Sequence, residues 1–244
     1  MPDRKNGQFP TTKWTLISRV RSGDALVARL ALDEICALYH YPLYCYIRRR
    51  GLEHHDAQDA LHEFLAKLLR LDSIKGICIE QGRLRAFLST ALQRFLFTWF
   101  RDHEKQRREF SMDAEAELAE AEGRFQRERL TDQDTPELIF ERKWAHELLR
   151  HVQRKLKDRY ADKGKAALFE ALRPALVAGG TLRGEDTPMI ATSLGMTPGA
   201  LRVAMSRLLD EYREVLRGEV LQTVENADDV EDEIAYMLTV FHTP

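Results

Sequence analysis

Residues 186–208 read DTPMIATSLGMTPGALRVAMSRL, and this stretch decides what kind of helical fold the second half of the chain forms. Two short patterns of helical periodicity flank Gly195, a residue that readily adopts the positive φ of a sharp reversal. Thr197 followed by Pro198 predicts the first residues of a second helix. If Leu201 and Leu208 face the core, seven residues face outward around the start of that helix: Thr197, Gly199, Ala200, Arg202, Val203, Ser206 and Arg207.

This is the layout of a helix-turn-helix, in which the first turns of the second helix enter the major groove of DNA. Small residues at the helix tip allow a close approach, and arginine can contact guanine or clamp phosphate. We therefore predict that these seven residues contact DNA. The alternative is an αα-hairpin inside a helical core, in which Arg202 and Arg207 would not share an exposed surface.

The rest of the chain also predicts helices, because almost no stretch alternates with period two and no proline lies between Pro42 and Pro136. Asp24 is the expected cap of one helix, Pro42 the expected start of the next, and Gly51 its end. We expect an all-α protein of two helical domains. Its expected parts are an N-terminal domain (1–109), an acidic linker (110–135), a helix-turn-helix domain (136–217) and an acidic, amphipathic C-terminal extension (218–244).

Charge is distributed unevenly, although the formal net charge is only −2. Residues 83–108 hold seven Lys or Arg against two acids, whereas residues 109–137 hold ten acids against three arginines. Such alternation favours a basic working surface with acidic connectors, the alternative being ordinary solvated helix faces. We predict contacts with nucleic acid along the basic stretch, at Arg83, Arg85, Arg94 and Arg101. Most aromatic residues in the same stretch are expected in the core.

The sequence HHDAQDALHEFLAKLLR (54–70) is the clearest amphipathic helix. Its apolar face includes Ala57, Leu61, Phe64 and Leu68. The opposite face is acidic and can meet a basic protein surface, or it can simply be solvated. The residues that we predict to bind a partner protein there are Asp56, Asp59, His62 and Glu63.

These segments together resemble the extracytoplasmic-function family of RNA polymerase sigma factors. MIATSLGMTPGALRVAMSRLLDEYREVL (189–216) resembles the family's C-terminal DNA-binding region, including an arginine late in the recognition helix, here Arg207. DAQDALHEFLAKLL (56–69) resembles its polymerase-docking helix. LDSIKG (71–76) with the basic stretch 83–108 resembles the loop and helix that engage the −10 element, and DTPELIFERKWAHELLRHVQRKL (134–156) resembles the first helices of the C-terminal region.

The resemblance covers residues 24–108 and 136–217 and implies a sigma-like initiation factor with promoter DNA and core RNA polymerase as partners. Residues 56–63 would hold polymerase. The basic stretch and its loop, with Ile74 and Lys75, would engage the −10 element, and the helix-turn-helix would read the −35 element. An anti-sigma factor is a further partner that this reading leaves open. The chain departs from the family at three positions: His62 stands where Gln is usual, Ile74 where an aromatic is frequent, and Arg94 where Asn is frequent.

A second hypothesis is a helix-turn-helix regulator whose N-terminal domain serves protein–protein contact without initiating transcription. A third is an interaction adaptor with no DNA binding. Enzymes are disfavoured, since the sequence has no phosphate-binding glycine loop and no Ser nucleophile elbow. We expect no catalytic residue, no cofactor and no metal site. Three cysteines without a C-x-x-C pair and the lack of a long apolar run favour a cytoplasmic protein with no membrane contact.

The C-terminal extension is acidic and has its own helical pattern. Its predicted apolar face consists of Val230, Ile234, Met237, Leu238 and Phe241. Two hypotheses follow. The extension either folds over a basic DNA-binding face and inhibits it, or docks on the second domain as a stabilising helix.

Overall fold

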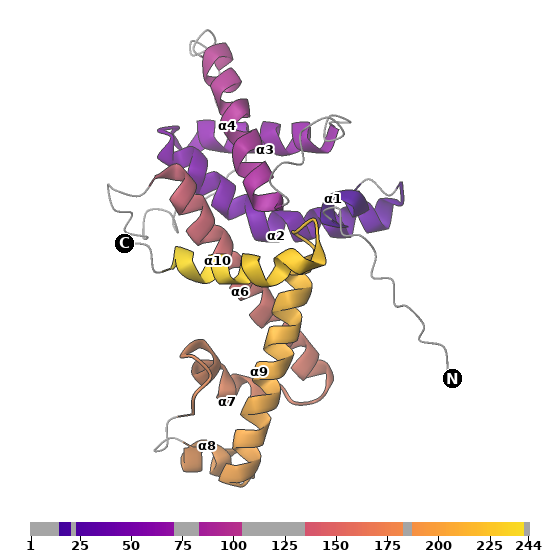
Figure 1. The fold of residues 1–244 in the computed structure, drawn as a ribbon, viewed down its shortest axis with the longest axis vertical. Coiled ribbons are helices and arrows are strands. Elements are labelled where there is room, and N and C mark those ends of the chain that lie inside the picture. The colour runs from indigo at the N-terminus through magenta and orange to yellow at the C-terminus, as the bar shows by residue number, and fades with distance from the viewer. Residues whose placement is uncertain (1–14, 21–22, 71–82, 104–134, 183–186, 242–244) are drawn as a thin grey trace. The chain divides into compact units, whose positions relative to one another are not determined.

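The computed structural model describes residues 15–20, 23–70, 83–103, 135–182 and 187–241, and within these ranges the protein is built from helices (Figure 1). No strand occurs among the described residues, so the predicted all-α class is confirmed. An isolated bridge pairs Arg83 with Val224. The elements in order are α1 (Thr15–Val20), α2 (Ala25–Arg49), α3 (His54–Arg70), α4 (Leu84–His103), α6 (Pro136–Asp162), α7 (Ala166–Val177), α8 (Thr187–Ser193), α9 (Pro198–Leu221), η2 (Ala227–Asp229) and α10 (Val230–Val240).

The chain divides into two compact units. The first contains residues 1–147 and 220–244, and the second contains residues 148–219. Helices α6 and α9 each contribute residues to both units. The boundaries therefore fall inside helices rather than at residues 136 and 217, and the C-terminal residues group with the N-terminal ones.

Helix α2 of the first unit is longer than the sequence predicts. Asp24 caps it as expected, its carboxylate accepting the N–H groups of Leu26 at 2.9 Å and Val27 at 3.1 Å. The predicted break at Pro42 is wrong, because the helix continues through it to Arg49. Interior proline costs a helix about 3 kcal/mol. Burial of the residues around it outweighs this cost, at roughly 1.5–3 kcal/mol for each large apolar side chain, since Tyr39 to Ile47 form a nearly continuous buried run.

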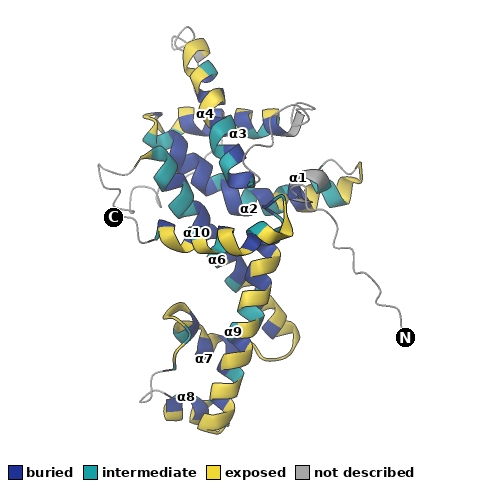
Figure 2. Ribbon diagram, in the orientation of Figure 1, coloured by how far each residue is buried: buried dark blue, intermediate teal, exposed yellow. Residues whose placement is uncertain are grey.

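Helices α3 and α4 pack through their apolar faces, with the rings of Phe64 and Phe95 at 5.6 Å between centroids. The first turns of α6 belong to the same unit. Tyr46 and Arg50 of α2 both donate to the Glu137 carboxylate, at 2.9 and 2.8 Å. Figure 2 shows the resulting core as a continuous set of buried residues on α2, α3 and α4.

Helix α10 also packs within the first unit (Figure 2). Its buried residues are Val230, Glu233, Met237 and Val240, at 7%, 1%, 1% and 3% exposure. The predicted apolar face is wrong at Leu238, which is 52% exposed. The helix instead turns a carboxylate, Glu233, inward.

In the second unit, α6, α7 and the first part of α9 all contribute buried apolar residues, which include Val152, Leu156, Phe169, Leu172, Leu201 and Leu208. A charged cluster is buried with them. The Glu219 carboxylate lies 2.7 Å from Lys155 Nζ and 3.2 Å from His151 Nε2. Burial alone would raise the pKa of Glu219, but the bonds from His151 and Lys155 outweigh it, and the pKa is lowered.

Candidate nucleic-acid interface

The reversal between α8 and α9 is closed by local hydrogen bonds. The Met196 N–H donates to the Ala191 carbonyl at 2.8 Å and the Gly195 N–H to the Thr192 carbonyl at 3.1 Å, which is the Schellman pattern that ends a helix. Gly195 has a φ of 64°, the left-handed conformation that this pattern requires at that position. The turn follows directly from the glycine that the sequence places there.

Helix α9 then begins with a side-chain cap. Thr197 Oγ1 accepts the N–H of Ala200 at 3.2 Å, three residues into the helix. Pro198 is the first helical residue, where its missing N–H costs nothing. Cap and proline together fix where the helix starts and which residues form its first turn.

The first three turns of α9 have one buried and one exposed face. Leu201, Met205 and Leu208 are at most 3% exposed. All seven residues that the sequence proposes as DNA contacts are exposed: Thr197, Gly199, Ala200, Arg202, Val203, Ser206 and Arg207. The sequence did not single out Met189 on α8, whose side chain is 68% exposed in the same helical pair.

Helical geometry places Arg202 and Arg207 at the two edges of this exposed face. Five residues at 100° each set them about 140° apart around the helix axis. Gly199, Val203 and Ser206 lie between them on the helical wheel. Within the described part of the chain, neither arginine forms an ion pair with an acidic side chain, so both guanidinium groups can meet an external anion.

Helix α4 of the first unit carries a second exposed stripe. Arg94 and Arg101 are exposed, and so are Phe97 at 75% and Phe100 at 41%. Phe95 and Trp99 are buried as expected, but the expectation that most of these aromatics lie in the core fails for the other two. Exposed aromatic rings between arginines are suited to stacking on unpaired bases.

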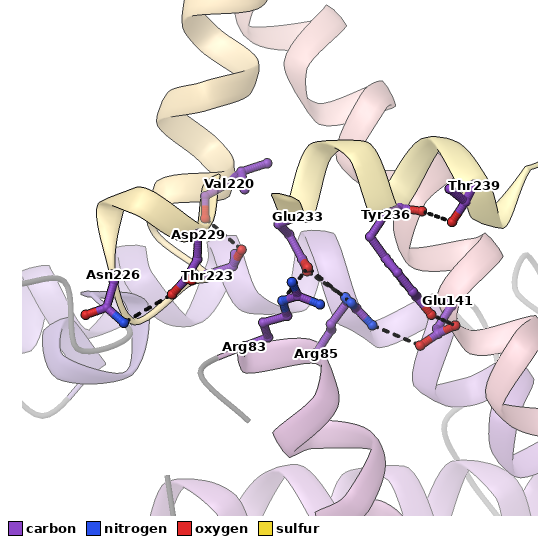
Figure 3. A network of polar contacts seen from close by, with 10 residues as sticks. All are labelled: Arg83, Arg85, Glu141, Val220, Thr223, Asn226, Asp229, Glu233, Tyr236 and Thr239. Atoms are coloured by element: carbon purple, nitrogen blue, oxygen red, sulfur yellow. Dashed lines mark hydrogen bonds and ion pairs between the residues drawn. The ribbon is translucent and has the colours of Figure 1, made fainter. Parts of the chain in front are cut away.

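Arg83 and Arg85 were also predicted to contact nucleic acid, and their surroundings differ from those of Arg94. Arg85 is 4% exposed and bonds to Glu233 at 2.5 and 3.1 Å and to Glu141 at 2.9 Å (Figure 3). Arg83 shares Glu233 at 3.0 Å, with 30% of its side chain exposed. A phosphate cannot reach Arg85 in this arrangement, so the expectation of an exposed contact there is corrected.

Tyr236 completes this network. Its hydroxyl donates to Glu141 at 2.5 Å, and its ring lies 4.0 Å from the Arg85 guanidinium carbon. Burial opposes the charge of Arg85, but its bonds to Glu233 and the charge of Glu141 outweigh burial and raise the pKa of the guanidinium. The charges balance as two arginines against two carboxylates. Sequence reasoning missed Glu233 because its partners lie about 150 residues away and no local pattern marks it.

Helix α3 presents the predicted acidic surface. Asp56, Asp59, His62 and Glu63 are exposed, while Ala57, Ala60, Leu61 and Phe64 on the opposite face are buried. The other two predicted contacts, Ile74 and Lys75, lie outside the described residues.

A further basic surface, not anticipated from the sequence, lies between α6 and α7 of the second unit. It is a hollow of about 340 Å³ lined by Arg150, Gln153, Arg154, Lys157, Phe169, Glu170 and Arg173. Glu170, its acid, pairs with Lys157 at 2.9 Å and Arg173 at 3.3 Å. Four cations against one carboxylate give this hollow a positive potential, in addition to the two arginines in the first turns of α9.

No protein-family model, curated protein or solved structure matches this chain. Among the residues that the structure describes, no helix is long and apolar enough to span a bilayer. Within the same ranges, no three His, Cys, Asp or Glu side chains gather in a way that could hold a metal ion.

Proposed function

We propose that the chain is a sigma-like transcription initiation factor that binds core RNA polymerase and recognises promoter DNA. The observation that carries the proposal is the exposed face of α9, where small residues lie between Arg202 and Arg207 beyond a capped turn. Such a face fits the major groove, since the small residues permit approach and the arginines supply donors to bases or phosphates. In this role α9 reads the −35 element.

The first unit has the complementary tasks in this proposal. The acidic face of α3 docks on a basic surface of polymerase through Asp56, Asp59 and Glu63, with His62 beside them. The exposed stripe of α4 engages the −10 element, where Arg94 and Arg101 meet phosphates and Phe97 stacks on an unpaired base. The protein works in the cytoplasm by binding, with no cofactor, and the chemistry belongs to the polymerase.

Run-off transcription tests the proposal. The full chain is combined with core RNA polymerase from the organism that carries the gene and a library of promoter sequences. Transcripts that start at a defined position, and depend on both upstream elements, are expected. Sequence-specific DNA binding without a transcript would favour the regulator hypothesis, and absence of both would favour the adaptor.

The α3 surface gives a second test on the same samples. Replacing Asp59 and Glu63 with lysine should abolish co-purification of core polymerase while leaving DNA binding unchanged. A matched control replaces Asp158, an exposed acid on α6, with lysine. Equal retention of polymerase by both variants would remove α3 from the proposed interface.

A further inference from the structure

The residues after α9 are an integral part of the first unit. Thr223 and Val224 are 1% and 0% exposed, and Met237 of α10 is 1% exposed. Such burial stabilises the packed state in proportion to the apolar area removed from water. This part of the chain is therefore not a loosely attached extension, and its contacts can determine how its neighbours are held.

Its neighbour is the start of α4. The first N–H groups of a helix have no partner within the helix. At α4, the Leu84 N–H donates to the Thr223 carbonyl at 2.8 Å, and Arg83 forms a backbone bridge with Val224. Thr223 is itself held, since its N–H and hydroxyl both donate to the Val220 carbonyl at 2.8 Å.

Side chains reinforce the same junction (Figure 3). Glu233 is 1% exposed and accepts from both Arg83 and Arg85, the two arginines that flank Leu84. Arg85 is further fixed by Glu141 of α6. If the Glu233 carboxylate rotated away, it and the Arg85 guanidinium would be left without partners at a buried site, which is costly. The junction therefore holds α4 in one orientation.

We propose that residues 220–240 act as a positioning element for α4, with Glu233 as the positioning residue that holds the helix start through Arg83 and Arg85. The inference rests on the proposed function in one respect, that α4 is the helix that engages the −10 element. The competing hypothesis is an inhibitory tail, in which the bond from Arg83 to Glu233 covers a DNA contact. Arg85 is bound on two sides by carboxylates and serves the fold in either case.

The test compares Glu233→Gln with Asp232→Asn in the full chain. Both remove one acid from α10, but Asp232 is exposed and Glu233 is buried. Hydrogen–deuterium exchange of peptides covering residues 84–92 reads the anchoring of α4 without reference to DNA. Exchange at least roughly tenfold faster in Glu233→Gln, with Asp232→Asn like wild type, is expected.

Run-off transcription and promoter-duplex binding read the consequence. Glu233→Gln should lower transcript yield several-fold without raising duplex affinity. Unchanged exchange would overturn the positioning role. A rise in duplex affinity would also overturn it, in favour of inhibition, because freeing Arg83 would then expose a DNA contact.

Two further arms keep these outcomes separate. If Glu233→Gln does not fold, Glu233→Asp keeps the charge but shortens its reach, and the same exchange and transcription comparison applies. If wild type gives no transcript, the proposed function fails. The exchange measurement still decides whether Glu233 anchors α4.

Discussion

At the start of α4, Arg83 and Arg85 point into the carboxylate of Glu233, whereas in the first turns of α9 Arg202 and Arg207 point to solvent. The residue type is the same and the local sequence is helical in both places. What differs is the presence of a buried acid brought in from elsewhere in the chain. An arginine that is held in this way stabilises the fold, and an exposed one remains available to a ligand.

The largest expected effect concerns stability, where replacing the buried Arg85 should matter far more than replacing the exposed Arg202. Arg85→Ala leaves Glu233 and Glu141 with fewer partners in a buried site, which costs about 3–5 kcal/mol. The midpoint of thermal unfolding should therefore lie roughly 6–20 °C lower. Arg202→Ala should stay within about 0.5 kcal/mol of wild type, because it removes an exposed side chain. Equal stability of the two variants would show that the α4 network contributes little.

The next largest effect concerns DNA affinity, for which the exposed arginine of α9 should matter. Arg202→Ala should weaken binding to the cognate duplex by about 1–3 kcal/mol if the side chain reads a base. Arg213→Ala is the matched control, since Arg213 lies exposed on the same helix and pairs with Asp210 at 3.0 Å. Titration of cognate and scrambled duplexes at fixed salt separates the cases. A loss shared by every duplex would make Arg202 a phosphate contact.

These two regions also differ in how far the sequence predicts them. The α8–α9 turn rests on local signals, a glycine at the reversal and a Thr-Pro start, which act within a few residues. The pairing of Arg85 with Glu233 spans 148 residues and follows from tertiary packing alone. The same reason explains why α2 continues through Pro42, where burial outweighs a local rule.

The exposed aromatics of α4 are intermediate in how far the sequence predicts them. Helical periodicity would have separated Phe95 and Trp99 from Phe97 and Phe100, because the two pairs lie on different faces. Our prediction from the sequence places most of the four in the core without separating the pairs. For Glu233 no such signal exists, since an acid among many acids gives no hint that it turns inward.

A smaller effect sharpens the comparison at the α9 turn. Gly195→Ala places a side chain at a φ of 64° with open space around it, so the cost is backbone strain of about 1–2 kcal/mol. Gly199→Ala, inside the helix and equally exposed, serves as control and should be neutral or slightly stabilising. Chemical denaturation followed by circular dichroism distinguishes them. Equal stability would mean that the turn relaxes without a positive φ.

The smallest effect concerns the buried carboxylate of Glu219 and is measured through the pH dependence of stability. The pKa of Glu219 is lowered in the folded state, so its contribution is present above its ordinary pKa of about 4.5 and is lost as pH falls through the lowered value. Wild type should therefore lose stability below pH about 4.5. Glu219→Gln should be less stable at neutral pH and should lose less on acidification. Parallel pH profiles of the two proteins, followed by urea unfolding, would contradict this assignment.

The ion pair of Arg85 with Glu233 also determines the order in which parts of the fold can form during synthesis. A chain is synthesised from its N-terminus at about 5–20 residues per second, so the 148 residues between these partners take roughly 7–30 s to appear. During that interval Arg85 has no Glu233 to bind, and the start of α4 lacks its carbonyl acceptor on Thr223. The first unit therefore reaches its final packing only after the second unit has been made. A ribosome that stops early therefore releases a chain whose N-terminal core lacks these contacts.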